Sequence, residues 1–169
     1  MNKCNKLNRR NPKNEKEKNR KLILLGDSHA RGLSGKLKDI LREKYEVIGY
    51  TKPNCSIKSL TVSAQTDIAK LANNEILFFI GGTKDVHNSN TDKSLSLISQ
   101  FPKSLTHTNV VVASVLNSYD FSASSKVNQE KCKFNRKLKK YVKPDMHVTV
   151  LDVDPDRCYF TNHGLHLNS

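Results

Sequence analysis

Five short runs of apolar residues divide this chain, and the stretches between them repeat apolar residues at helical spacing. The runs cover residues 22–25, 47–48, 76–80, 110–113 and 148–151. A short continuous apolar run is typical of a strand that is buried on both faces, as in a parallel sheet. Strands that alternate with helices predict an α/β domain with a five-stranded parallel sheet and helices on both faces.

The intervening stretches predict helices over residues 30–44, 57–71, 94–105 and 126–143. In the last of these, Val127, Phe134, Leu138 and Tyr141 form one apolar face before Pro144 ends the helix. The chain has 169 residues, which is long enough for one domain with a sizeable core.

Most of the net charge of +13 lies in two blocks. Residues 1–21 contain nine Lys or Arg, two Glu and little apolar surface, so we expect a disordered basic tail before a folded domain at 22–169. Residues 126–143 contain eight Lys or Arg and one Glu. Because basic blocks attract phosphates without sequence preference, nucleic acid is one candidate partner. A solubilising tail and a solvated helix face are the alternatives.

Several classes of protein are not indicated. No apolar run approaches the roughly 20 residues of a membrane span. The first residues lack the apolar stretch of a secretory signal, so we expect an intracellular protein, cytoplasmic or nuclear. The four cysteines are far apart and form no C-x-x-C pair, which predicts free thiols and no metal site.

Polar segments follow three of the predicted strands, at residues 26–28, 81–85 and 163–166. In parallel sheets, ligands bind at the carboxyl ends of strands. Ser28, at a strand-to-helix turn, is a candidate nucleophile because helix N–H groups there stabilise an oxyanion. His166 is the candidate base. The alternatives are that Ser28 caps the helix and that His166 is a surface or packing residue.

These segments resemble the motif blocks of the SGNH (GDSL-type) hydrolases. Residues 26–32, Gly-Asp-Ser-His-Ala-Arg-Gly, are similar to the G-D-S-x-x-x-G block that carries the nucleophile. Residues 82–85, Gly-Thr-Lys-Asp, lie where the family has G-x-N-D, and residues 163–166, His-Gly-Leu-His, where it has D-x-x-H. The segment from residue 22 onward is most similar to esterase-like domains of animal transposable elements, including LINE-type retrotransposons.

The resemblance implies a three-layer α/β/α sandwich of flavodoxin-like appearance. It also implies hydrolysis of carboxylic (acyl or acetyl) esters of small molecules, without a cofactor or metal. Ser28 would attack the acyl carbon, His166 would activate Ser28, and the Ser28 N–H would donate to the oxyanion. The same blocks assign binding or oxyanion roles to Asp27, Gly82, Thr83, Lys84 and Asp85.

Two departures concern the oxyanion site. Lys84 replaces the family's oxyanion-donating Asn; it offers a charged donor on a longer, flexible stem, or it is a solvated loop residue. The glycine that usually follows the second strand is also missing. Asn54 is the best substitute, because Asn tolerates left-handed backbone angles.

Two further departures concern the base. His163 replaces the Asp that orients it; a neutral His163 can accept a hydrogen bond from His166, and the alternatives are Asp152, Asp154 and Asp156. The chain also ends three residues after His166, where related chains continue into a last helix. This predicts a poorly anchored base loop and leaves open whether the domain is truncated.

The sequence therefore supports two functions of different classes. The first is an SGNH-type serine esterase, weak or specialised, that uses Ser28 and His166. The second is a catalytically impaired SGNH-like module that binds nucleic acid or a protein partner through its basic patches.

Overall fold

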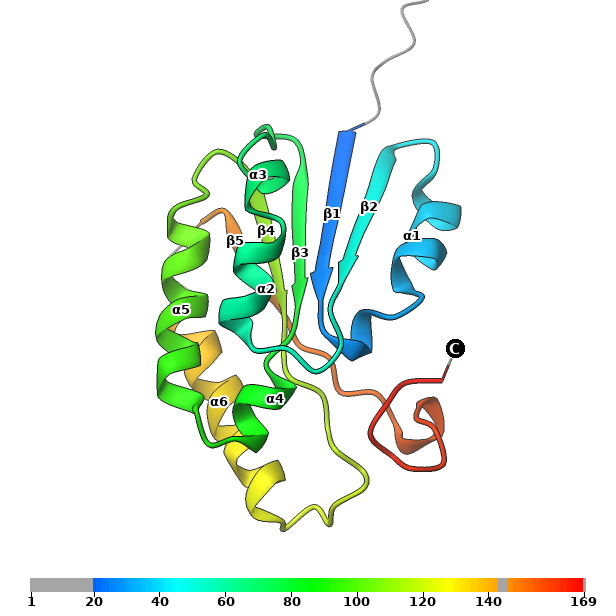
Figure 1. Cartoon of the computed structure of the whole chain (residues 1–169), viewed down its shortest axis with the longest axis vertical. Helices are drawn as coiled ribbons and strands as arrows, with labels where there is room; N and C mark the ends of the chain where they lie inside the picture. Colours follow the sequence, from blue (N-terminus) through cyan, green and yellow to red (C-terminus); the bar gives the residue numbers. More distant parts are fainter. Residues whose placement is uncertain (1–19, 143–145, 169) are drawn as a thin grey trace, which may run out of the picture.

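The computed structural model describes residues 20–142 and 146–168. Its five strands form one sheet in the order β2-β1-β3-β4-β5, and every neighbouring pair is parallel (Figure 1). The strands are β1 (Arg20–Gly26), β2 (Tyr45–Thr51), β3 (Ile76–Ile80), β4 (Asn109–Ala113) and β5 (Val148–Leu151). The five apolar runs are these strands, so the predicted fold class is confirmed.

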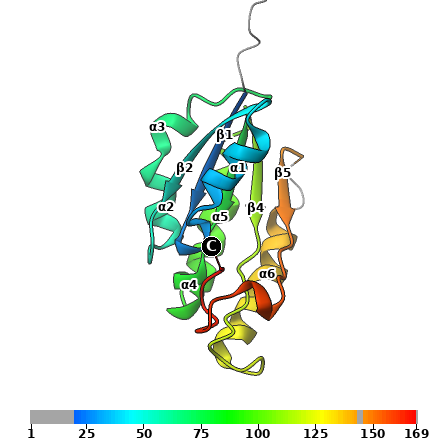
Figure 2. The same ribbon diagram turned by 90° about the vertical axis from the view of Figure 1, so that its right-hand side faces the viewer.

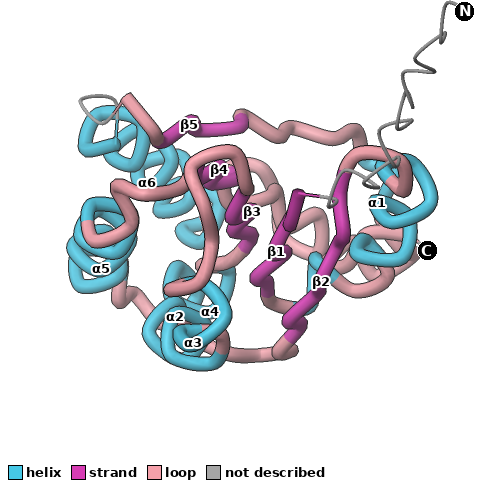
Figure 3. The backbone as a smooth tube through the Cα atoms, turned by 90° about the horizontal axis from the view of Figure 1, so that it is seen from above, coloured by secondary structure: helices cyan, strands magenta, loops and turns pink. Residues whose placement is uncertain are grey.

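Helices cover both faces of the sheet, but unequally (Figure 3). One face carries α1 (Leu33–Leu41), whose Leu33, Leu37 and Leu41 pack on a small cluster around Leu22 and Leu24 of β1. The opposite face carries α2 (Ile57–Ser63), α3 (Gln65–Ile68), α4 (Thr83–His87), α5 (Thr91–Lys103) and α6 (Lys126–Val142).

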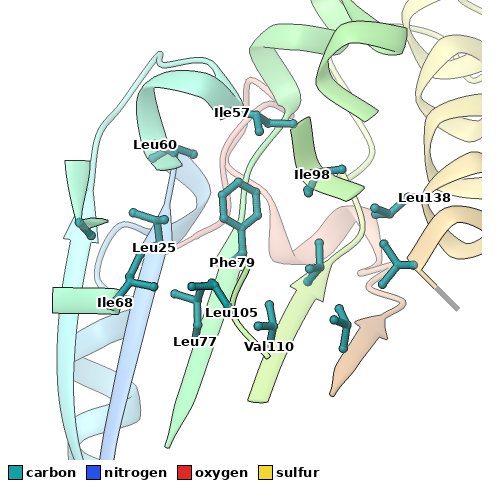
Figure 4. Packing of buried hydrophobic residues seen from close by; sticks show 14 of the residues in the cluster. Leu25, Ile57, Leu60, Ile68, Leu77, Phe79, Ile98, Leu105, Val110 and Leu138 are labelled. Carbon is teal, nitrogen blue, oxygen red and sulfur yellow. The ribbon is translucent and has the colours of Figure 1, made fainter. Parts of the chain in front are cut away.

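The larger core lies between these five helices and the sheet. Phe79 of β3 is at its centre, next to Ile57 of α2 and Ile98 of α5 (Figure 4). Phe79, Ile57, Ile98, Leu60 and Leu138 are at most 1% exposed. Burial of a side chain of this size stabilises the fold by about 1.5–3 kcal/mol, so this face provides most of the rigidity beneath the site.

Several element boundaries differ from the sequence prediction. The predicted helix over 57–71 is two short helices separated at Ala64, and the one over 30–44 shrinks to α1. Arg20 and Lys21, which we assigned to the tail, begin β1, because they pair with Tyr45 and Glu46 of β2. The rest of that tail, 1–19, lies outside the described residues.

The carboxyl ends of the strands all point to one edge of the sheet, at the bottom of Figure 1. Three segments meet there: the 3-10 helix η1 (Ser28–Ala30) after β1, α4 after β3, and the chain after β5, which includes the 3-10 helix η2 (Arg157–Tyr159) (Figures 1 and 2). The three polar segments singled out in the sequence are therefore brought to one edge.

Across residues 20–142 and 146–168, no helix is long and apolar enough to cross a membrane. In the same ranges, no group of three or more His, Cys, Asp and Glu could hold a metal ion. Cys55, Cys132 and Cys158 have free thiols, while Cys4 lies outside the described residues.

Candidate active site

The turn after β1 presents Ser28 to solvent at the edge of the sheet. The turn is tight: a Cβ on Gly26 would lie 2.3 Å from the Cβ of Ala30. The N-cap of η1 is Asp27, whose carboxylate accepts a hydrogen bond from the His29 N–H at 3.0 Å. Ser28 is the first residue of η1 and not its cap, which corrects that alternative. Its hydroxyl has no hydrogen-bond partner among the described residues, so it makes no hydrogen bond with His166 in this structure.

The turn after β3 holds the start of α4 close to η1. Gly82 has φ of 114°, a left-handed conformation that favours glycine. A Cβ there would also lie 3.0 Å from Cγ2 of Val115. The next residue, Thr83, has its hydroxyl oxygen 3.3 Å from Nδ1 of His29. The second motif block is thus in contact with the first.

Asp85 is buried behind the site rather than lining it. Its Oδ2 accepts a hydrogen bond from the Ile57 N–H at 2.9 Å, and its Oδ1 accepts one from the Ser94 hydroxyl at 2.7 Å. It therefore ties α4 to the starts of α2 and α5. Since its oxygens are used by the scaffold, Asp85 supports the site without facing a ligand.

Asn54 and Lys84 meet at the mouth of the site. Asn54 has φ of 51°, the left-handed conformation that the sequence predicts. Its carbonyl oxygen accepts a hydrogen bond from the Lys84 ammonium at 2.9 Å. Lys84 thus bridges α4 and the loop that follows β2, and its ammonium is held at the edge of the cavity.

The loop that carries His166 is well anchored, so the predicted poor anchoring is wrong. Phe160 and Leu167 form an antiparallel bridge, and the Thr161 N–H donates to the His166 carbonyl at 2.8 Å. The Gly164 carbonyl accepts from the Tyr119 N–H, also at 2.8 Å. Backbone hydrogen bonds therefore hold the loop together and attach it to the segment that contains Tyr119.

A cavity of about 440 Å³ lies between these segments. Ser28 and His166 both line it, although they are 138 positions apart in the sequence. The remaining lining residues are Asp27, His29, Arg31, Pro53, Asn54, Cys55, Thr83, Lys84, His87, Asn88 and Leu165. Most of the predicted site residues therefore share one cavity.

His163 does not line this cavity. It is exposed and makes no hydrogen bond within the part of the chain that the structure describes. The three aspartates considered in its place do not line the cavity either. Asp152 pairs with Lys139 at 2.6 Å, and Asp154 accepts a hydrogen bond from the Asn117 amide at 2.7 Å.

Electrostatic interactions separate the two histidines at the site. Burial disfavours the charged form of His29, but the hydrogen bond and negative charge of Asp27 outweigh this and raise the pKa of His29. For His166, partial burial and the nearby positive charges of His29 and Arg31 lower the pKa, and Asp27 and Asp120 only partly oppose this. The lowered pKa favours the neutral form of His166, the form that can accept a proton.

Sequence reasoning missed seven residues that line the cavity: His29, Arg31, His87 and Asn88, and also Pro53, Cys55 and Leu165. His87 and Asn88 follow Thr83 and Lys84 by four positions, so one face of α4 presents both pairs. A sequence prediction of the helix at 83–87 would have pointed to these residues. Five residues are too few, however, to show a periodic pattern in the sequence.

Comparison with solved structures places the chain among known folds. An acetyl xylan esterase superposes with a TM-score of 0.73 at 17% identity, and the match covers 88% of this chain and 91% of that one. A GDSL-like lipase from Bacteroides thetaiotaomicron gives 0.70 at 16% identity, covering 88% and 80%. A member of the lipolytic G-D-S-L family from Veillonella parvula also gives 0.70 at 16%, covering 88% and 89%.

No model of a protein family matches the sequence, and no curated protein matches it. At identities of 16–17%, the structural likeness establishes the fold. The chain has the α/β fold of the SGNH (GDSL-type) hydrolases, a fold whose neighbours here are esterases and lipases.

Proposed function

We propose that this protein is a serine ester hydrolase of SGNH type, acting on carboxylic esters through Ser28 and His166. One observation supports this above all. The Ser28 hydroxyl and the His166 imidazole, whose pKa is lowered, line the same cavity at the carboxyl edge of a parallel sheet. The neighbouring structures include an acetyl xylan esterase and a GDSL-like lipase, whose names denote ester hydrolysis. A compact acyl ester fits a cavity of this size.

The reaction would proceed through an acyl-enzyme. Ser28 Oγ attacks the acyl carbon while its proton passes to the neutral ring of His166, which forms a tetrahedral oxyanion. The intermediate collapses, and the alcohol leaves with the proton from His166. Water then attacks the acyl-Ser28 ester, again giving its proton to His166, and the acid is released with the Ser28 hydroxyl restored.

The oxyanion would be stabilised by donors on three segments. The first is the Ser28 N–H at the start of η1. The second is the Asn54 N–H after β2, where the left-handed backbone supports the role of the missing glycine. The third is the Lys84 ammonium, which already reaches Asn54 across the cavity mouth. A charged donor in a confined site stabilises an oxyanion more than the same donor in water does.

Hydrolysis of p-nitrophenyl acetate tests the proposal. Ser28→Ala and His166→Ala should each lower kcat by on the order of 10³-fold or more, since nucleophile and base act as a unit. Ser96→Ala, an exposed serine of α5 far from the cavity, is the matched control and should leave kcat unchanged. If wild type and Ser28→Ala give the same rate, the esterase proposal fails.

A second candidate function is binding of nucleic acid through the basic face of α6. Three lysines there have acidic partners: Lys133 with Glu130, Lys137 with Asp92, and Lys139 with Asp152. Arg136 and Lys140 are exposed and favour this alternative. RNA affinity should then fall steeply as salt rises, and a salt-independent affinity would contradict it.

The kinship with transposable-element domains stays a prediction that rests on the three motif blocks. So does binding by the basic tail, which lies outside the described residues.

A further inference from the structure

His29, the residue after the proposed nucleophile, is buried between two parts of the chain. It is 6% exposed. Its Nδ1 lies 3.1 Å from Oδ1 of Asp27, and its Nε2 lies 2.8 Å from the carbonyl oxygen of Leu165. The ring therefore joins the turn after β1 to the loop near the end of the chain.

The chemistry of the two partners determines the proton positions on the ring. A carbonyl oxygen only accepts, so Nε2 must carry a proton and donate to Leu165. A carboxylate also only accepts, so a protonated Nδ1 donates to Asp27; the Thr83 hydroxyl, 3.3 Å from the same nitrogen, is its second neighbour. The raised pKa of His29 agrees with a doubly protonated ring that donates at both nitrogens.

This link ends one residue before the proposed base. Leu165 precedes His166 directly, and the rings of His29 and His166 are 5.8 Å apart between centroids. His166 itself makes no side-chain hydrogen bond to another described residue, and His163 makes none either. The His166 ring is therefore placed by the backbone that carries it and by its contact with the His29 ring.

We propose that His29 is the positioning residue for the base: it ties the backbone of the base loop, at Leu165, to the buried carboxylate of Asp27 beside the nucleophile. This inference rests on the proposed esterase function. In the family that the chain resembles, an Asp at the position of His163 orients the base. Here the contact between His29 and the backbone of Leu165 takes over that role. It also keeps Ser28 and His166 in register, because His29 is fixed to the same turn as Ser28.

A matched pair of substitutions separates the two contacts. In His29→Gln, the amide nitrogen is as many bonds from Cα as Nε2 of His29, so it can still donate to Leu165. In His29→Asn, the amide nitrogen corresponds to Nδ1, so it can reach Asp27 but not Leu165. Both variants remove the ring charge. His29→Gln keeps the contact with Leu165 and loses the one with Asp27, whereas His29→Asn keeps the contact with Asp27 and loses the one with Leu165.

We expect His29→Asn to lower kcat by about 10²-fold with KM little changed, as a misplaced catalytic group does. His29→Gln should keep most of kcat. In both variants the acid limb of kcat/KM should move to higher pH. The charged or titratable groups that face His166 are His29, Arg31, Asp27 and Asp120, and both variants delete one positive charge from this set. The limb shift checks that the His29 ring carries a positive charge, whereas retention of kcat in His29→Gln and its loss in His29→Asn check the positioning contact with Leu165.

Thermal unfolding of each variant shows how much of the protein is folded at the assay temperature, so that kcat can be calculated per folded molecule. Equal loss of kcat in both variants, or full kcat in His29→Asn, would overturn the positioning role while Ser28-dependent activity persists. If wild type shows no more activity than Ser28→Ala, the esterase function itself is overturned, and the positioning role with it.

Discussion

The imidazole rings of His29 and His166 lie 5.8 Å apart, between ring centroids, and are tilted by 53°. One ring is buried and bonded at both nitrogens, whereas the other is exposed at the cavity and makes no side-chain hydrogen bond among the described residues. A positive charge on His29, which Asp27 favours, disfavours protonation of His166, as the proposed role of His166 as base requires.

The pH dependence of activity should report this pair. A base acts in its neutral form, so kcat/KM should rise with pH through the pKa of His166 and then level off. Because burial, His29 and Arg31 lower that pKa, the rise should be centred below about 6.5, the ordinary value for histidine. Arg31→Ala removes one positive charge and should shift the rise to higher pH.

The matched control is Arg136→Ala, an exposed arginine on α6, which should leave the profile in place. A rise centred above the ordinary histidine value in wild type would contradict the electrostatic account of the site.

The sequence was enough to predict the fold because a parallel sheet leaves a strong local pattern. Each strand is an apolar run, and the ends of those runs indicate where Ser28, Thr83 and His166 come together. The role of His29 could not be predicted in this way. Its two partners are a carboxylate two positions away and a backbone carbonyl 136 positions away, and no spacing rule encodes the second contact.

Asp85 and the base loop illustrate the same limit. The motif block assigns Asp85 to the site, but its hydrogen bonds to Ile57 and Ser94 depend on how α2 and α5 pack. Anchoring of the loop depends on Tyr119, which lies in the segment between β4 and α6 that has no periodic pattern. Contacts of this kind arise only once the tertiary structure is formed.

Substitution of Lys84 tests the charged oxyanion donor. Loss of one such donor lowers kcat by about 10²–10³-fold in a serine protease, so Lys84→Ala should lower kcat by about 10²-fold. Lys84→Asn places the amide of the resembled family at this position and should recover part of that loss. Steady-state kinetics with p-nitrophenyl acetate checks both variants. If Lys84→Ala retained the wild-type kcat, Lys84 would not act as an oxyanion donor and would only bridge to Asn54.

Gly164 is where the base loop touches the rest of the domain most closely. Its φ is 76°, and a Cβ there would lie 2.6 Å from the carbonyl carbon of Tyr119 and 2.7 Å from the Asp120 nitrogen. Gly164→Ala should therefore displace the loop, costing about 1–2 kcal/mol for the backbone conformation alone and more for the clash. We expect a lower Tm and a lower kcat.

Gly35 provides the control for that substitution. It lies within α1, and a Cβ there meets nothing within 4 Å. Gly35→Ala should raise stability by about 0.5–1 kcal/mol, because alanine is the better helix former, and should leave kcat unchanged. If Gly164→Ala matched Gly35→Ala in both readouts, the close approach at Tyr119 would not hold the loop.

The buried ammonium of Lys131 in α6 should lower the free energy of unfolding of the domain. It is 4% exposed, and its ammonium has no hydrogen-bond partner among the described residues. Burial lowers its pKa, which Cys132 and Asp154 only partly oppose. The unfolded state therefore binds more protons than the folded state, and stability should increase as pH rises from this lowered pKa toward the ordinary value of about 10.4.

Lys131→Met removes the buried amine and leaves an unbranched apolar side chain that is one atom shorter. Replacement of a buried charge by a well-packed apolar side chain is often stabilising by about 1–4 kcal/mol, so we expect a Tm several degrees higher at neutral pH. The gain should shrink in alkaline solution, where the unfolded chain also loses the proton. Lys140→Met, on the exposed face of the same helix, should change Tm little. A lower Tm in Lys131→Met would mean that the amine has a stabilising partner, and calorimetry of the two variants at neutral and alkaline pH decides between these outcomes.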